Sequence, residues 1–147
     1  MASSLKSSVF KLHSSSLSGA VAAIVLFVAS CSGNQLNQCK EILEINRKAA
    51  LVTDTAKTGN REELMNIAKG LDQLATELES LEVNNEKIQV YQNSFVKSYR
   101  DIGQALRGIV AAIDDPNSQA ITSAVQALDK STSHNEVLLQ EVRALCP

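Results

Sequence analysis

Three features of the chain predict an all-α fold, an antiparallel up-down-up-down four-helix bundle. From residue 38 onward, apolar residues recur at alternating spacings of three and four, which is the helical period. Helix breakers are scarce, because Pro116 is the only proline before the last residue and the chain has six glycines. Short polar breaks divide the pattern into four segments, and short connections make neighbouring helices antiparallel.

Each of the four segments has a series of apolar positions on one face. The first segment has Ile42, Ile45, Ala49, Val52 and Ala56. The second has Leu64, Ile67, Leu71, Leu74, Leu78 and Leu81. The third has Ile88, Tyr91, Phe95, Ile102, Ala105, Ile109 and Ile113, flanked by Tyr99 and Leu106. The fourth has Ile121, Ala124, Leu128, Leu138, Val142 and Leu145. We expect these faces to form the core of a domain over residues 38–147.

The breaks between the segments have the composition of helix ends. Gly59 is expected to end the first helix and Asn60 to cap the second, with Glu63 as its capping-box partner. Two asparagines at residues 84–85 separate the second helix from the third. Residues 115–116 combine an N-capping aspartate with a proline suited to the first turn of the fourth helix.

Residues 1–30 have the features of a separate leader. They contain two lysines and no acidic residue, and an apolar run covers residues 19–29. This run is shorter than the roughly 20 residues that cross a hydrocarbon core, but it suits the middle of a signal peptide. An ordinary signal peptide or a single membrane helix, followed by an incidental cysteine, is one alternative. An organelle transit peptide is another, because the start is rich in serine and free of acids.

The apolar run ends in Val28-Ala29-Ser30-Cys31, which resembles the lipobox of bacterial lipoproteins. The resemblance covers only the leader and Cys31. It implies that residues 1–30 are a lipoprotein signal peptide and that Cys31 is lipidated and becomes the first mature residue. Residues 31–37 would then be the lipidated cysteine and a short polar tether.

The same resemblance implies export and anchoring at the extracytoplasmic side, on the periplasmic face or the outer membrane. Ser32, in place of an acidic residue, favours the outer membrane. All sixteen acidic residues and twelve of the fourteen Lys and Arg follow Cys31, which leaves a formal charge near −4. Binding to nucleic acid or to an anionic lipid surface needs a positive patch, so we expect no nucleic-acid partner and attachment through the lipid alone.

The cysteine count supports this interpretation. Three cysteines leave one unpaired in an oxidising compartment, and lipidation of Cys31 leaves Cys39 and Cys146. In the predicted topology, the start of the first helix and the end of the fourth lie at the same end of the bundle. We therefore predict a Cys39–Cys146 disulfide; two free buried thiols are the alternative, and export favours the bridge.

Residues that carry catalytic or metal chemistry are sparse after Cys31. His134 is the only histidine there, and no Glu-x-x-His or Cys-x-x-Cys-His motif occurs. Bundle sites for di-iron or haem need such ligands, and no serine lies in a nucleophile-elbow motif. We therefore expect no metal, no cofactor and no catalytic residue.

Polar residues interrupt the apolar stripe of the fourth segment at Ser131 and Asn135. They predict a polar interior layer, which either fixes the register of the helices or lines a small polar cavity. The candidate partners of this layer are Asn46, Thr53, Ser94 and Ser98.

The unequal lengths of the segments predict a surface for a partner. The third and fourth helices should exceed the first two by about 10 Å. With the bridge and a short 83–86 turn at the tethered end, the excess should project at the other end and expose Ile109, Ile113, Ile121 and Val125. The alternative is a bend near Gly108 that packs this hairpin on itself.

Together these features predict a lipid-anchored, non-enzymatic interaction or accessory module of the bacterial cell envelope, held to the membrane by a lipid on Cys31 and with a protein partner. The alternative is a small-ligand-binding helical bundle that uses the polar interior layer.

Overall fold

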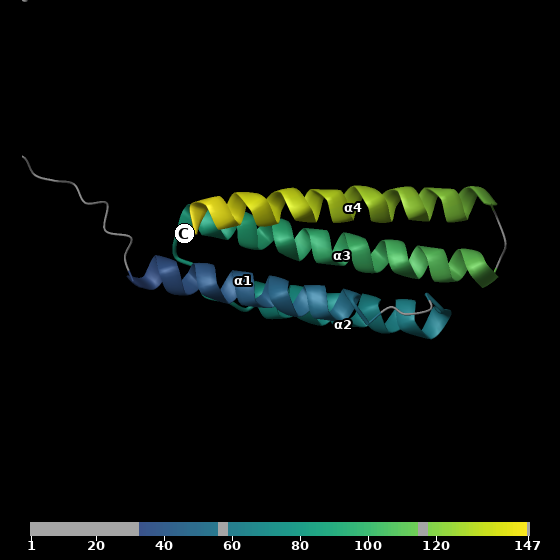
Figure 1. Cartoon of the computed structure of the whole chain (residues 1–147), viewed down its shortest axis with the longest axis horizontal. Helices are drawn as coiled ribbons and strands as arrows, with labels where there is room; N and C mark the ends of the chain where they lie inside the picture. The colour runs from purple at the N-terminus through teal and green to yellow at the C-terminus, as the bar shows by residue number, and fades with distance from the viewer. Residues whose placement is uncertain (1–32, 56–58, 115–117, 147) are drawn as a thin grey trace, which may run out of the picture. The chain divides into compact units, whose positions relative to one another are not determined.

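A computed structural model describes residues 33–55, 59–114 and 118–146 of the chain. These residues form four helices: α1 (Gly33–Thr53), α2 (Arg61–Glu79), α3 (Glu86–Asp114) and α4 (Ser118–Leu145). Consecutive helices run in opposite directions (Figure 1), so the predicted all-α, up-down-up-down four-helix bundle is confirmed.

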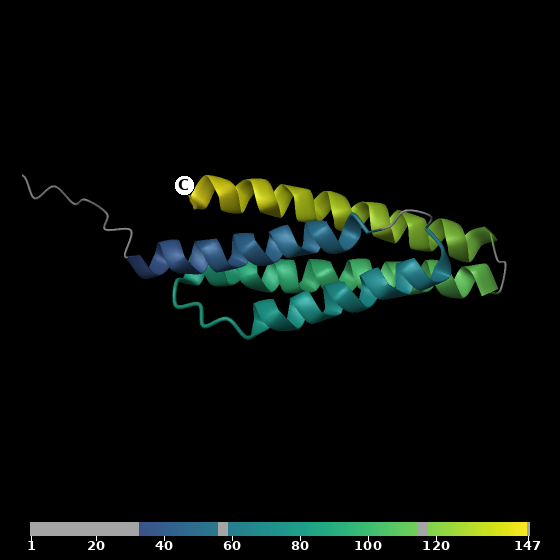
Figure 2. The same ribbon diagram turned by 60° about the horizontal axis from the view of Figure 1, so that its bottom comes forward.

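The four helices do not pack equally. α3 packs along its length against both α2 and α4, which lie on opposite sides of it (Figures 1 and 2). α1 packs mainly against α2 and meets α3 and α4 only briefly. As a result α4 has buried core residues only near its C-terminus, and the predicted core positions Ile121, Ala124, Leu128 and Leu145 are half-buried.

The buried face of α3 is rotated from the predicted stripe. Tyr99 and Leu106, which were expected to flank the stripe, are buried, with 1 % and 5 % of their surface exposed. Tyr91 and Ile109, which were expected on the stripe, are half-buried. The prediction was wrong on this point because α3 has neighbours on two sides, so its most buried line is set by both α2 and α4.

α1 begins earlier than expected. Residues 33–37, which the sequence analysis assigned to a tether, are helical and begin two residues after Cys31. The side chain of Gln38 is buried, and its Nε2 donates hydrogen bonds to Asn34 Oδ1 (3.4 Å) and to the Glu82 carbonyl (3.5 Å). The burial of Gln38 against the α2–α3 connection favours a helical backbone for residues 33–37, which precede it.

The connection between α2 and α3 is longer than the predicted turn. α2 ends at Glu79, so Leu81 lies in the 80–85 connection. The buried Gln92 Nε2 donates hydrogen bonds to the carbonyls of Leu78 (2.6 Å) and Leu81 (2.9 Å). The end of α2 is therefore level with the seventh residue of α3, and the start of α3 extends about 9 Å past it.

The predicted capping of α2 is present. Asn60 Oδ1 accepts a hydrogen bond from the Glu63 N–H (3.0 Å), and the Glu63 carboxylate accepts one from the Gly59 N–H (2.9 Å). Gly59 has a positive φ of 64° but does not end α1, which stops six residues earlier at Thr53. The Thr53 hydroxyl donates to the Ala50 carbonyl (2.9 Å) at that helix end, as hydroxyl side chains in a last turn often do.

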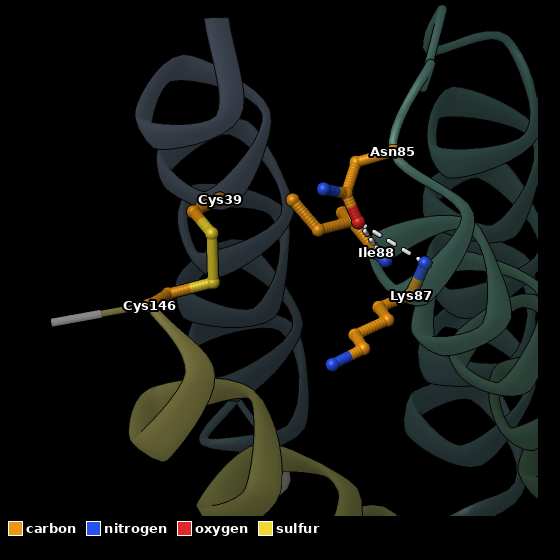
Figure 3. The surroundings of a disulfide bond; sticks show 5 residues. All are labelled: Cys39, Asn85, Lys87, Ile88 and Cys146. Atoms are coloured by element: carbon orange, nitrogen blue, oxygen red, sulfur yellow. Dashed lines mark hydrogen bonds between the residues drawn. A yellow bond between two sulfur atoms is a disulfide. The ribbon is translucent and has the colours of Figure 1, made fainter. Parts of the chain in front are cut away.

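Asn85 caps the start of α3, where residues 84–85 predicted a break. Its Oδ1 accepts hydrogen bonds from the N–H groups of Lys87 (3.0 Å) and Ile88 (3.2 Å), as Figure 3 shows. The predicted cap at residues 115–116 lies outside the described residues.

Candidate functional site

A disulfide bond joins Cys39 of α1 to Cys146 at the end of α4 (Figure 3), as the sequence analysis predicted. The two Cα atoms are 5.7 Å apart although the residues are separated by 107 positions. Both cysteines are buried. The bond defines one end of the bundle, called the disulfide end below; the opposite end, with the α3–α4 hairpin, is called the tip.

Cys31, the predicted lipidation site, lies outside the described residues. α1 begins only two residues after it, at Gly33. Within the three described ranges, no helix has the length and apolarity needed to span a bilayer.

The tip extends past α1. The Tyr99 hydroxyl donates a hydrogen bond to Asn46 Oδ1, which places these residues at the same level of two helices that run in the same direction. Because α1 ends seven residues after Asn46, its end is level with about Leu106. Residues 107–114 of α3 extend about 12 Å beyond it, and Figures 1 and 2 show α3 and α4 reaching past α1.

α2 covers part of this extension. The Ala68 carbonyl lies 3.3 Å from the position that a Cβ atom on Gly103 would take, so these two residues are level. α2 begins seven residues before Ala68, level with about Val110. Only about 6 Å of α3 therefore extends past α2. The predicted projection of about 10 Å at the tip was too long on the side of α2. Part of the length difference between α3 and α2 lies at the disulfide end instead.

Two of the four residues predicted to form the partner surface are exposed. Ile113 exposes 52 % of its surface and Val125 exposes 49 %. Ile109 and Ile121 are half-buried, and Val110 is buried. We call Ile113 and Val125 the tip patch. It is smaller than predicted because packing of the hairpin shields the other two isoleucines.

The predicted polar interior layer is not a connected network. Ser131 and Asn135 are both half-buried. The Ser98 hydroxyl donates to the backbone carbonyl of Ser131 (3.4 Å). The Asn135 Oδ1 atom is buried and has no hydrogen-bond partner among the described residues. Asn46, a predicted partner of this layer, pairs with Tyr99 instead.

The pair of Asn46 and Tyr99 is the buried polar contact that joins α1 to α3. The Tyr99 hydroxyl donates to Asn46 Oδ1 across 2.7 Å, and Asn46 Nδ2 donates to the Ile42 carbonyl across 2.9 Å. Burial raises the pKa of the Tyr99 phenol above its ordinary value. The phenol therefore stays protonated as a donor, and the pair orients the two helices.

Ion pairs between helices lie on the surface. They include Lys48–Glu77 between α1 and α2 (2.5 Å), and Arg100–Glu79 (2.7 Å) and Arg107–Asp72 (2.8 Å) between α2 and α3. Within α1, the hydrogen bond from Arg47 lowers the pKa of the Glu44 carboxyl. Partly exposed pairs of this kind contribute little to the free energy of unfolding. The buried core therefore contributes more to the stability of the bundle than these pairs do.

His134 is exposed on α4. In the part of the chain that the structure describes, no group of three or more His, Cys, Asp or Glu residues lies close enough together to hold a metal ion. The absence of a metal and of a catalytic residue in the whole protein remains a prediction.

A groove on the seam between α3 and α4 was not predicted. It has a volume of about 760 Å³ and a floor that includes Ala105 and Gly108 of α3 and Ala124 and Ala127 of α4. The signal in the sequence was the spacing of small residues at four and three positions on the fourth segment. Ala124 was instead predicted to belong to the apolar stripe of the fourth segment.

The features that bear on function are therefore the disulfide, the tip patch and the α3–α4 groove. Each is built from residues on helices or, for Cys146, directly after one, so its position depends on helix packing. No family model, no curated protein and no solved structure matches the chain.

Proposed function

We propose that this chain is a lipid-tethered, non-enzymatic interaction module of a bacterial cell envelope. The observation that carries the proposal is the Cys39–Cys146 disulfide. Because it joins the start of α1 to the end of α4, a lipid on Cys31, two residues before α1, anchors the disulfide end. The tip patch then faces away from the membrane, where a protein partner reaches it.

Two features support the proposed compartment. A structural disulfide persists in an oxidising environment, which agrees with export through a leader of residues 1–30. The domain then lies on the extracytoplasmic side, at the periplasmic face or the outer membrane. Stable attachment needs two or more acyl chains, which the lipobox resemblance implies for Cys31.

The anchor is tested by fractionation of cells that express Cys31→Ser. The wild-type protein is expected in membranes after a high-salt wash, and the variant is expected to be soluble or uncleaved. Asn37→Ser is the matched control, because it introduces the same residue at an exposed position of α1, keeps the lipid site and the disulfide, and should stay with membranes. Retention of a Cys31→Ser protein that carries no other lipid contradicts the anchor.

The partner surface is tested with a photo-crosslinking residue at Ile113 in native membranes. A discrete adduct is expected there and not from the same group at Gln140, which is exposed on α4 away from the tip. Ile113→Glu and Val125→Glu should abolish adduct formation from a crosslinking residue at exposed Ala111 while leaving the melting temperature unchanged. If both substitutions instead lower the melting temperature, these residues serve the core and the tip patch is not a binding surface.

A second candidate function is small-ligand binding at the polar interior. One observation favours it: the buried Asn135 Oδ1 lacks a hydrogen-bond partner among the residues that the structure describes, and such an atom is costly unless it is satisfied. Native mass spectrometry of the purified protein tests this function. A stoichiometric small molecule that Asn135→Ala releases supports it, and an empty protein of the expected mass contradicts it.

A further inference from the structure

Two grooves lie end to end on the seam between α3 and α4. The one toward the tip, of about 760 Å³, begins at Lys97 and His134. The one toward the disulfide end, of about 490 Å³, begins at Ser94 and Leu138. The starting residues are three apart on α3 and four apart on α4, so both grooves lie on the same faces of the two helices. We call the face of α3 and α4 that carries these two grooves the α3–α4 seam.

The seam has the length of a helix. Along α3 its lining extends from Lys87 to Gly108, which corresponds to about 32 Å at 1.5 Å per residue. A helix of about 21 residues covers this distance. The floor near the tip is made of alanines and Gly108, and the position of a Cβ atom on Gly108 is 3.4 Å from the Ala124 Cβ. Small residues on both sides allow the ridge of a third helix to approach closely.

The lining of the seam changes in character along its length. The section toward the disulfide end has four apolar lining residues, Val90, Tyr91, Leu138 and Leu145, together with Ser94 and the oppositely charged Lys87 and Glu141. Val90 exposes 63 % of its surface. The section toward the tip has the small-residue floor. Between these sections lie four charged or ionisable side chains: Lys97, Asp101, Lys130 and His134.

The central section has an excess of positive charge. Lys97 forms an ion pair with Asp101 (2.6 Å), which neutralises both. Lys130 forms no ion pair with any described residue, and His134 faces the same seam one turn away. The chain beyond Cys31 is acidic overall, so this cation is complementary to a negative charge on a partner.

We infer that the α3–α4 seam is the docking site of an amphipathic helix from a partner protein. The helix carries an acidic residue at its centre, opposite Lys130, and large aliphatic residues about two turns to either side. This spacing follows from the positions of Tyr91 and Ala105, one in each of the two sections. They lie 14 positions apart along α3, which is about four helical turns, or two turns to either side of the midpoint. The inference rests on the proposed interaction role and not on the lipid anchor.

A helix fits the seam better than a lipid chain does. An acyl chain laid along the seam would cover Lys130, which has no ion-pair partner among the described residues, with apolar groups, and burying a charge without a partner is costly. A helix places a carboxylate at that level while its aliphatic side chains fill both apolar sections. This is the helix-in-groove mode of peptide recognition.

The test uses the full chain carrying Cys31→Ser and a synthetic helical peptide of about 21 residues. The peptide has a central glutamate with leucines two turns to either side, and a second peptide has lysine in place of the glutamate. Fluorescence anisotropy should show that the glutamate peptide binds at least tenfold more tightly. Lys130→Glu should reverse this order, whereas Lys69→Glu, an exposed lysine on α2, should leave it unchanged.

Filling the seam provides a second measurement. Ala127→Leu should weaken binding of the glutamate peptide at least tenfold, and Ala144→Leu, an exposed alanine of α4 outside the seam, should not. Ser123→Leu repeats the test at a second exposed lining residue if Ala127→Leu fails to fold. Failure of both peptides to bind, or a preference that Lys130→Glu does not change, overturns the inference. Binding of a fluorescent fatty acid that Ala127→Leu blocks, without peptide binding, also overturns it and assigns the seam to a lipid. Fractionation of Cys31→Ser reports on the anchor independently of each of these results.

Discussion

The Tyr99 hydroxyl donates a 2.7 Å hydrogen bond to Asn46 Oδ1 in the interior of the bundle, 53 positions away along the chain. This bond links α1 to α3, which otherwise meet only briefly. It also fixes how far α1 extends along α3, and so determines how much of the tip is left uncovered. The residue pair therefore connects the stability of the domain to the shape of its proposed binding surfaces.

Tyr99→Phe should lower the free energy of unfolding by about 1 to 3 kcal/mol, because it leaves the Asn46 oxygen buried without a donor. The measurement is urea unfolding followed by circular dichroism. Tyr91→Phe is the control: this tyrosine is half-buried on the same helix, and its loss should change stability by less than about 0.5 kcal/mol. Equal effects of the two substitutions would contradict the role of the Asn46 bond.

The stability of the protein should fall in alkali through Tyr99. Burial raises the pKa of its phenol in the folded state above the ordinary value of about 10. Above that pH the unfolded chain loses the proton and the folded chain keeps it, so stability that is present at lower pH is lost as the pH rises. Between about pH 9 and 11, the free energy of unfolding should therefore fall more steeply with pH in the wild type than in Tyr99→Phe. Parallel curves would show that Tyr99 does not contribute.

Removal of the disulfide should destabilise the domain by about 4 to 5 kcal/mol in the chain-entropy model, because the bond closes a loop of more than one hundred residues. The double variant Cys39→Ala and Cys146→Ala is compared with the wild type by urea unfolding. The reduced wild type is the control and should resemble the double variant. Unchanged stability in both would show that the bond contributes nothing to the fold.

Gly70→Ala should destabilise the α1–α2 contact by about 1 to 3 kcal/mol. A Cβ atom at Gly70 would lie only 2.7 Å from Val52 Cγ1, and a valine side chain has few other rotamers to adopt. Val52→Ala in the same chain should recover most of the loss. Gly108→Ala is the matched control and should stabilise the protein, because its new Cβ would meet the Ala124 Cβ at an ordinary contact distance of 3.4 Å. The higher helix propensity of alanine should add up to about 1 kcal/mol to the free energy of unfolding. Thermal melting should show a lower melting temperature for Gly70→Ala and a higher one for Gly108→Ala.

Several local features of the fold could be predicted from the sequence because they depend on residues close together in the chain. The Asn60–Glu63 cap and the Asn85 cap use hydrogen bonds within three residues. The Cys39–Cys146 pairing also followed, because the antiparallel order of four helices brings the chain ends of the domain together.

The lengths and offsets of the helices could not be predicted in the same way. Gln38 and Gln92 hold the 80–85 connection through the carbonyls of Glu82 and Leu81, which are 44 and 11 positions away from them. Both are polar residues in helical segments, and both are buried. These hydrogen bonds favour a non-helical connection over residues 80–85. As a result α2 ends before Leu81 and does not reach the disulfide end.

The sequence by itself determined four amphipathic helices, their antiparallel order and the pairing of Cys39 with Cys146, because helical period, capping and chain direction are local properties. Only the tertiary structure decided which apolar residues are covered. Tyr99 is buried and Ile113 is exposed although both lie on the apolar side of α3. The physical reason is that burial depends on where a neighbouring helix ends, and α1 ends at Thr53, before it reaches the level of Ile113.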